Sequence, residues 1–371
     1  MLSQEFRRHL HANPELSFKE YHTAEFIEES LHAEGIECRR IAETGVLARI
    51  EGQGDLSRAI VLRADIDALP VHEQTGLEYA SRYEGVMHAC GHDMHAAILF
   101  GVLQRLHSEP TFEGTVFGLF QPGEECNPGG ASKVLAENPF EEYEICAVLG
   151  EHTDSGLEVG EFGFCAGSFM ASSDELRFWV RGRGGHAAMR DKIDDTVTAA
   201  AQLILSLNAL NAESVVLSTG RVVANGATNV IPSEVAIEGT LRTFNTIGDN
   251  IAAREQAWND IRAAVEATDE KYGTTTEIDI SRGYPCVEND VALTATAERL
   301  CSEMFTAKRL ARRFVAEDFG FYCEHYPSLF YRIGVGEAAG RSHSSTFAPD
   351  ERAIAPGVEF MYRLALEILS K

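Results

Sequence analysis

The sequence MHACGHDMHAA occupies residues 87–97 and leads directly into an apolar run. It places three imidazoles, a thiol and a carboxylate within eight residues. Imidazole and thiolate bind borderline and soft divalent metals best, and the glycine between Cys90 and His92 allows a tight turn. The stretch therefore predicts a metal site at the start of a helix, which we expect over residues 94–106. The alternative is the polar end of an amphipathic helix, which suits a single histidine better than this cluster.

The length and composition predict a soluble protein of two domains. A chain of 371 residues is longer than one hydrophobic core usually supports. The net charge of -25 disfavours nucleic acid and anionic membranes as partners, because both are bound through Lys and Arg. No apolar window reaches membrane-spanning length, and the first residues lack a signal-peptide pattern. We therefore expect a cytoplasmic protein.

Four predicted strands each lead to side chains that can bind metals. These strands cover residues 59–63, 116–120, 145–149 and 329–333. The side chains at their ends are Asp65 and Asp67, Glu124 and Glu125, His152, and His343, respectively. Ligands of open α/β sheets bind at the carboxyl ends of strands, so we expect these side chains to share one site. Helices between the strands predict an α/β layered catalytic domain with a central sheet.

The pattern changes after about residue 171. Residues 175–181 alternate between apolar and charged side chains, as in a half-buried strand. The elements expected next are a helix at 195–210, strands at 214–223 and 234–244, a helix at 251–272 and a strand at 275–281. This order is that of a ferredoxin-like α+β module. We predict a catalytic domain of residues 1–171 and 285–371, with the ferredoxin-like domain inserted at 172–284.

The metal-type side chains are numerous enough for two ions. Neighbouring side chains diverge, so one glutamate of the pair 124–125 can bind a metal while the other takes a proton from water. A pair of divalent ions needs about five or six donors. The five predicted ligands are Cys90, His92, Glu125, His152 and His343. Asp67 is then predicted to orient a ligand, and the Cys90 thiolate favours zinc, nickel or cobalt.

Seven motifs resemble those of the aminoacylase and carboxypeptidase metallopeptidases, in the same order along nearly the whole chain. They are RADIDALP (63–70), MHACGHD (87–93), QPGEE (121–125), GGHAA (184–188), NVIP (229–232), GTLRTF (239–244) and AEDF (316–319). The most similar branch contains amidohydrolases, namely hippurate hydrolase, deacetylases of N-acyl amino acids and of N-acetyldiaminopimelate, and hydrolases of indole-acetyl amino acids. The chain departs from many members at Glu151, which is often aliphatic, and at Cys126, which is often glycine.

The resemblance implies a catalytic domain with two divalent metal ions and a lid domain that mediates dimers in many members. It assigns the same five metal ligands, and it makes Glu124 the general base. In the lid it implies that His186 stabilises the oxyanion, sometimes from a partner subunit. Asn229 and Arg242 match positions that contact the substrate carboxylate, which the fork of an arginine binds bidentately. The resemblance also allows manganese as the native metal.

We therefore expect an enzyme, a dinuclear metal-dependent amidohydrolase that cleaves the amide bond of N-acyl amino acids. Metal-activated water would attack, Glu124 would act as general base, and Asp67 and His186 would support catalysis. The partners expected are a small-molecule substrate and a second copy of the chain, bound through the lid. One alternative is a dipeptidase or carboxypeptidase with the same metal site. Another is a metal-dependent binding protein without turnover, although a closed structural site has no use for a spare base.

Overall fold

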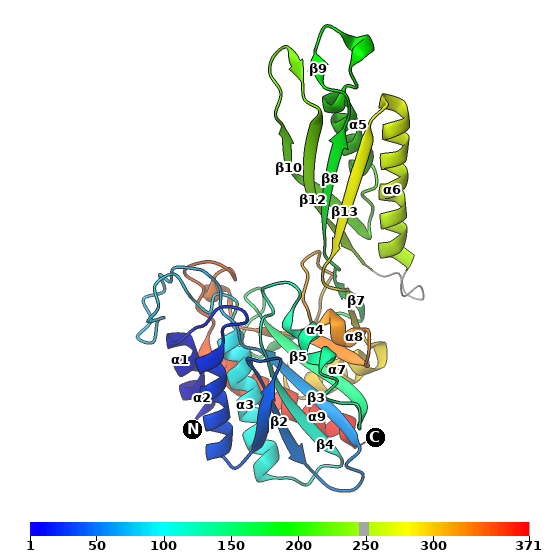
Figure 1. The fold of residues 1–371 in the computed structure, drawn as a ribbon. Helices are drawn as coiled ribbons and strands as arrows, with labels where there is room; N and C mark the ends of the chain where they lie inside the picture. The colour runs from blue at the N-terminus through cyan, green and yellow to red at the C-terminus, as the bar shows by residue number, and fades with distance from the viewer. Residues whose placement is uncertain (245–251, 371) are drawn as a thin grey trace. The chain divides into compact units, whose positions relative to one another are not determined.

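The computed structural model describes residues 1–244 and 252–370. Contacts divide the chain into two compact units. The first unit comprises Met1–Gly167, Glu288–Ala311 and Asp318–Lys371, and the second comprises Ser168–Val287 and Arg312–Glu317. Figure 1 shows the large sheet of the first unit and the smaller sheet of the second.

The first unit is built around a mixed eight-stranded sheet with the order β1-β2-β4-β3-β5-β16-β6-β15. Its strands are β1 (Glu37–Ile41), β2 (Gly45–Glu51), β3 (Arg58–Asp65), β4 (Thr115–Gln121), β5 (Glu144–Asp154), β6 (Glu161–Phe164), β15 (Thr306–Arg309) and β16 (Ser328–Gly334). The four central strands β4, β3, β5 and β16 run parallel and are almost entirely buried. The α/β architecture with a large central sheet, predicted from the alternating pattern, is confirmed.

Helices cover both faces of this sheet. They are α1 (Ser3–Ala12), α2 (Tyr21–Ala33), α3 (His92–Ser108), α4 (Gly130–Ala136), α7 (Val291–Met304), α8 (Gly320–Cys323) and α9 (Ile354–Leu369), with single 3-10 turns at Glu337–Ala339 and Glu351–Ala353. Helix α3 contacts α9, β3 and β5, whereas α4 contacts β4 and α8 contacts β16. Leu62 and Arg63 of β3 point to opposite faces, the first into the core with α3 and the second toward Asp318 beside α8. None of the helices that the structure describes is both long and apolar enough to cross a bilayer.

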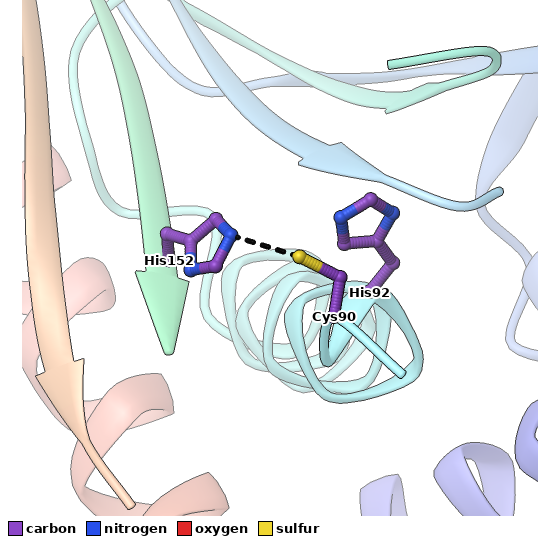
Figure 2. Close-up of side chains that lie close together, drawn as sticks. All are labelled: Cys90, His92 and His152. Atoms are coloured by element: carbon purple, nitrogen blue, oxygen red, sulfur yellow. Dashed lines mark hydrogen bonds between the residues drawn. The ribbon is translucent and has the colours of Figure 1, made fainter. Parts of the chain in front are cut away.

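The parallel strands bring their carboxyl ends to one edge of the sheet. In sheet order, the residues at this edge are Glu124 and Glu125 after β4, Asp67 after β3, His152 within β5, and His343 after β16. Figure 2 shows His152 of β5 facing Cys90, with His92 at the start of α3 beside them. Strand β5 extends past its predicted end at residue 149, because it pairs with β16 as far as Asp154.

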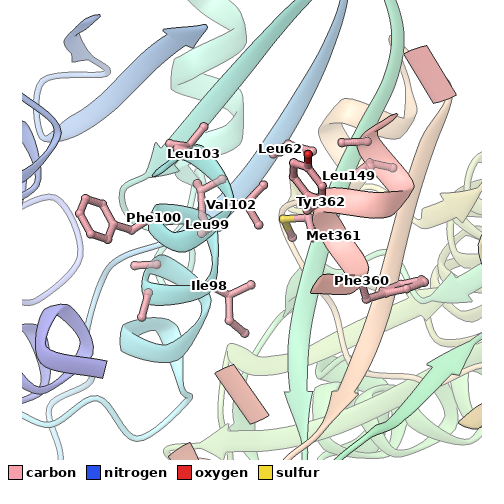
Figure 3. Close-up of a cluster of buried hydrophobic side chains, with 14 of the residues drawn as sticks. Leu62, Ile98, Leu99, Phe100, Val102, Leu103, Leu149, Phe360, Met361 and Tyr362 are labelled. Carbon is pink, nitrogen blue, oxygen red and sulfur yellow. The ribbon is translucent and has the colours of Figure 1, made fainter. Parts of the chain in front are cut away.

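The apolar run that follows the histidine cluster anchors α3 in the core. Figure 3 shows the side chains of this run beside Leu62 of β3, Leu149 of β5 and Met361 of α9. The ring of Phe100 stacks on Phe6 of α1, with 4.3 Å between the ring centroids. Full burial of one such side chain contributes about 1.5–3 kcal/mol to stability. The start of α3 is therefore held firmly where its histidines meet β5.

The second unit contains an antiparallel sheet with the order β10-β12-β8-β13. Its main elements are β8 (Asp174–Arg181), α5 (Thr196–Asn208), β10 (Val215–Ala224), β12 (Glu234–Thr243), α6 (Ala252–Tyr272) and β13 (Thr275–Arg282). The shorter ones are β9 (Gly185–His186), β11 (Val230–Ile231) and a 3-10 turn at Arg190–Lys192, while β7 (Gly167–Met170) and β14 (Val287–Asn289) pair where the chain passes from one unit to the other. Both helices share one hydrophobic core with the sheet. The predicted start of the second helix, Ile251, lies outside the described residues.

Candidate metal centre

Gly91 allows the start of α3 to approach β5 closely. Its φ of 93° lies in the left-handed region that favours glycine, directly before the first residue of α3. A Cβ atom at Gly91 would lie only 2.7 Å from Oγ1 of Thr153 in β5. The Thr153 hydroxyl also donates a hydrogen bond of 3.1 Å to the carbonyl oxygen of Cys90. Cys90 is thus held against the end of β5.

The structure brings the five predicted ligands together. The Cys90 sulfur lies 3.3 Å from His152 Nε2 and 3.3 Å from His343 Nε2. Oε1 of Glu125 lies 3.1 Å from His343 Nε2 and 4.0 Å from His92 Nε2. One thiol, three imidazoles and one carboxylate therefore point at the same small volume.

These residues fit a pair of divalent ions. His92 Nε2 and Glu125 Oε1 are buried, and neither is satisfied by a well-aligned hydrogen bond among the described residues, although His343 Nε2 lies 3.1 Å from Oε1. Leaving a buried polar atom unpaired typically costs about 1–3 kcal/mol, and a cation between the two atoms would remove that cost. Sulfur and imidazole donors suit borderline ions such as zinc.

Asp67 orients two of the candidate ligands. His92 Nδ1 donates to the Asp67 carbonyl oxygen at 2.9 Å and to its Oδ1 at 3.1 Å, which leaves Nε2 as the nitrogen that faces a metal. The backbone N–H of Glu125 donates to Asp67 Oδ2 at 3.0 Å, and the Ser17 hydroxyl donates to the same oxygen at 2.7 Å. On the other side of the cluster, Nδ1 of His152 donates to the Thr153 carbonyl oxygen at 2.7 Å.

The electrostatics of the cluster also suit a cation. Burial raises the pKa of the Cys90 thiol to about 12, and a divalent cation is a group that would favour its thiolate. Burial opposes charge on His92, but the Asp65 carboxylate and Cys90 more than offset it and raise the pKa of His92 well above its ordinary value. The surroundings of His92 thus favour positive charge, and a cation bound there would in turn favour the thiolate of Cys90.

Glu124 is buried beside these donors. It is 6% exposed, and one of its carboxylate oxygens lies within 4.8 Å of a His92 nitrogen and of a Glu125 oxygen. Its position excludes a solvated acidic turn, which would leave both glutamates in water. A carboxylate next to a metal ligand is well placed to exchange protons with water or substrate there.

A buried network behind the donors was not predicted from the sequence. His95 Nδ1 donates to Asp65 Oδ1 at 2.6 Å, while its Nε2 accepts the Thr153 N–H at 2.9 Å. Arg63 Nη1 donates to Asp65 Oδ2 at 2.7 Å, and the same oxygen lies 3.7 Å from His92 Nε2. The feature of the sequence that could have predicted this network is Arg63, because a charged residue in a buried apolar strand needs ionic partners.

The two unusual residues near the site do not join the donors. Glu151 points to the opposite face of β5 from His152 and accepts a hydrogen bond of 3.1 Å from the Tyr331 hydroxyl. Burial raises the pKa of Glu151 to about 8. Cys126 is exposed on the loop after Glu125.

The other three predicted site residues belong to the second unit. His186 in β9 and Asn229 are exposed and neighbour one another, since the Ala187 N–H donates to the Asn229 carbonyl oxygen at 2.9 Å. Arg242 lies near the far end of β12, where it pairs with Val216. From the start of β12 to Arg242 the chain rises about 26 Å, so Arg242 is well separated from the other two within the unit.

Comparison with known proteins gives one consistent relationship. Residues 61–367 match peptidase family M20/M25/M40. An N-acetyl-L-cysteine deacetylase of Bacillus subtilis is 36% identical in an alignment of 372 positions, which covers 98% of this chain and 87% of that protein. An N-acetyldiaminopimelate deacetylase of Exiguobacterium sibiricum is 35% identical in an alignment of 365 positions, which covers 94% of this chain and 95% of the relative.

Solved structures agree with this relationship. The crystal structure of a dinuclear metal-binding peptidase from Bacillus subtilis superposes with a TM-score of 0.88 at 33% identity, covering 99% of this chain and 98% of the other. The resemblance that the seven motifs suggested is confirmed by both kinds of comparison. The chain is an enzyme of a hydrolytic family and belongs to peptidase family M20/M25/M40.

Proposed function

We propose that the chain is a dinuclear metal-dependent amidohydrolase that cleaves the amide bond of N-acyl amino acids. The observation that carries this proposal is the buried Glu124 carboxylate, within 4.8 Å of two donor atoms of a five-ligand cluster. A cluster that served structure alone would need no additional carboxylate beside it. The deacetylase names of two relatives support an acylated amino acid as the substrate.

The proposed ligands are Cys90, His92, Glu125, His152 and His343. Two divalent ions held by them would polarise the scissile carbonyl and lower the pKa of the attacking water. Glu124 would take the proton of that water and deliver it to the leaving amine nitrogen. His186 would donate a hydrogen bond to the tetrahedral oxyanion. We propose zinc or manganese as the ions, with nickel or cobalt as further candidates that a thiolate ligand accepts.

The test is reconstitution of the metal-stripped protein with each ion, followed by assays of amine release from N-acetyl, N-benzoyl and dipeptide substrates. We expect turnover of N-acyl amino acids and two bound ions per chain. Glu124→Gln should retain both ions and lose at least about 100-fold in kcat, the usual contribution of a general base. Glu141→Gln, at an exposed glutamate in the same unit, is the matched control and should keep full activity.

The outcomes separate the competing functions. Turnover of dipeptides alone would indicate a dipeptidase or carboxypeptidase. A protein that binds two ions but turns over nothing in the panel would indicate a metal-dependent binding protein. A Glu124→Gln variant with full activity would refute the assignment of the base.

We also propose that the second unit acts as a lid and forms a homodimer. Its elements run in the β-α-β-β-α-β order of a ferredoxin-like module. Asn229 and Arg242 are both proposed to bind the substrate carboxylate, yet the rise of about 26 Å along β12 keeps them apart within one chain. If one subunit supplied Arg242 and the other supplied Asn229 and His186, all three residues could contact one small substrate.

Light scattering should give the mass of a dimer, and mixed dimers test whether His186 acts across it. Co-expression of Glu124→Gln and His186→Ala chains should restore activity, because one site of each mixed dimer then has both residues intact. No recovery in purified mixed dimers would contradict action across subunits.

A reducing cytoplasm is proposed as the compartment, in keeping with eight free cysteines.

A further inference from the structure

Asp318 is a buried acceptor for three donors. Its side chain is fully buried in the first unit, just before α8. Oδ1 accepts from Arg63 Nη2 at 2.8 Å, and Oδ2 accepts from the Ala131 N–H at 3.0 Å. Gln121 Nε2 donates to both oxygens, at 3.0 and 2.8 Å.

These contacts close the loop that carries the base. Gln121 is the last residue of β4, and Ala131 lies in the first turn of α4. The loop between them contains Glu124. A hydrogen bond of 2.9 Å from the Gly130 N–H to the Gly123 carbonyl oxygen joins its two ends. A carboxylate oxygen of Glu124 lies within 4.8 Å of one of Asp318. Asp318 therefore accepts hydrogen bonds from both ends of the loop, at Gln121 and Ala131, and Glu124 on this loop lies close to it.

Only a carboxylate satisfies this arrangement. Gln121 Oε1 already accepts from Arg63 Nε at 2.9 Å and from the Tyr322 hydroxyl at 3.0 Å, so the amide nitrogen of Gln121 has to face Asp318. Every neighbour of Asp318 in this set is thus a donor. An amide in place of the carboxylate would have only one acceptor oxygen. Its NH₂ group would face at least one of these donors, and neither group could then form a hydrogen bond with the other.

The metal ligand on the same loop has a separate support. The backbone N–H of Glu125 is held by Asp67 Oδ2 at 3.0 Å, and Asp67 has no part in the contacts of Asp318 described above. A change at Asp318 should therefore disturb Glu124 more than it disturbs metal binding. A shift of about 1 Å at a reacting group can cost about 100-fold in rate.

We propose that Asp318 is a positioning residue, which clamps the loop of residues 122–130 so that Glu124 reaches the reacting water. The inference rests on the proposed role of Glu124 as general base. It makes a specific claim about kinetics: loss of the clamp lowers kcat and leaves KM and the affinity for metal nearly unchanged.

The main test is Asp318→Asn, with the exposed Asp55→Asn as the matched control. Burial raises the pKa of Asp318 to about 6, so assays at about pH 8 keep the carboxylate of the parent ionised. We expect kcat to fall about 100-fold, with KM and bound metal within about twofold of the parent. Hydrogen exchange followed by mass spectrometry should show faster exchange of the loop amides, including Ala131, and no change in α3.

A second variant covers the case in which Asp318→Asn does not fold. Gln121→Met removes the tether at the start of the loop but leaves Arg63 and Ala131 paired with Asp318, and it should show the same pattern with a smaller fall in kcat. The inference is overturned if a folded variant keeps kcat within about twofold, or if metal affinity falls as far as kcat does. It is also overturned if loop exchange is unchanged. An active parent whose Glu124→Gln variant remains active would instead refute the proposed function.

Discussion

The sharpest prediction concerns Asp67 and the affinity for metal. In the parent protein, Asp67 Oδ2 accepts from Ser17 and from the backbone of Glu125, while Oδ1 accepts from His92 Nδ1. In Asp67→Asn, the single amide oxygen should stay with the two donors at Oδ2. The new N–H group would then face His92 Nδ1, and it would favour the tautomer whose Nε2 carries the proton and cannot bind metal.

The structure also limits the size of the effect. The carbonyl oxygen of Asp67 still accepts from His92 Nδ1 at 2.9 Å, so the correct tautomer retains one support. Changes to residues that orient metal ligands typically cost 10–100-fold in affinity. We therefore expect about tenfold for Asp67→Asn, or about 1.4 kcal/mol. Asp67→Ala also frees Glu125, and we expect it to lose about 100-fold, or about 2.7 kcal/mol.

The assay is competition for zinc or manganese against a chromophoric chelator at constant pH. Ser17→Ala removes one donor to Asp67 but keeps the carboxylate, so it is the matched control and should change affinity by less than about threefold. Binding by Asp67→Asn within twofold of the parent would refute the reasoning. So would an equal loss in Ser17→Ala, because the carboxylate would then not be the group that matters.

Three further predictions test the surroundings of the site. Burial opposes charge on His11, but Asp93 and Glu73 more than offset it and raise the pKa of His11 to about 9. The stabilisation, about 3 kcal/mol, is complete below pH 6.5 and is lost as pH rises through about 9, so denaturant titrations of His11→Gln should lack this pH dependence. Gly91→Ala should lose about 1–3 kcal/mol of stability and most metal binding, because of its positive φ and the contact with Thr153; an unchanged melting temperature would contradict this. Removal of metal by a chelator should lower the melting temperature, and rebinding should release a proton that calorimetry in buffers of different ionisation enthalpy can count; no proton release would argue against a thiolate ligand.

Much of the first unit could be predicted because its signals are local. The four central strands are buried on both faces, so they appear in the sequence as short apolar runs, and the structure contains all four. The alternation at residues 175–181 is confirmed, since Leu176, Phe178 and Val180 are buried and the residues between them are exposed or, at Trp179, half-buried. Strands β1 and β15 were missed because both lie at edges of the sheet, where polar side chains face water and leave no apolar pattern.

By itself, the sequence determined which side chains could bind metal and that they follow parallel strands, because residue chemistry and strand periodicity are local properties. Only the tertiary structure decided which distant groups meet. It set Arg63 between Asp65 and Asp318, which is 255 residues away. It also turned Glu151 away from the donors and separated Arg242 from His186. These outcomes depend on the order of strands in the sheets and on which face each side chain occupies, and no short stretch of sequence encodes either.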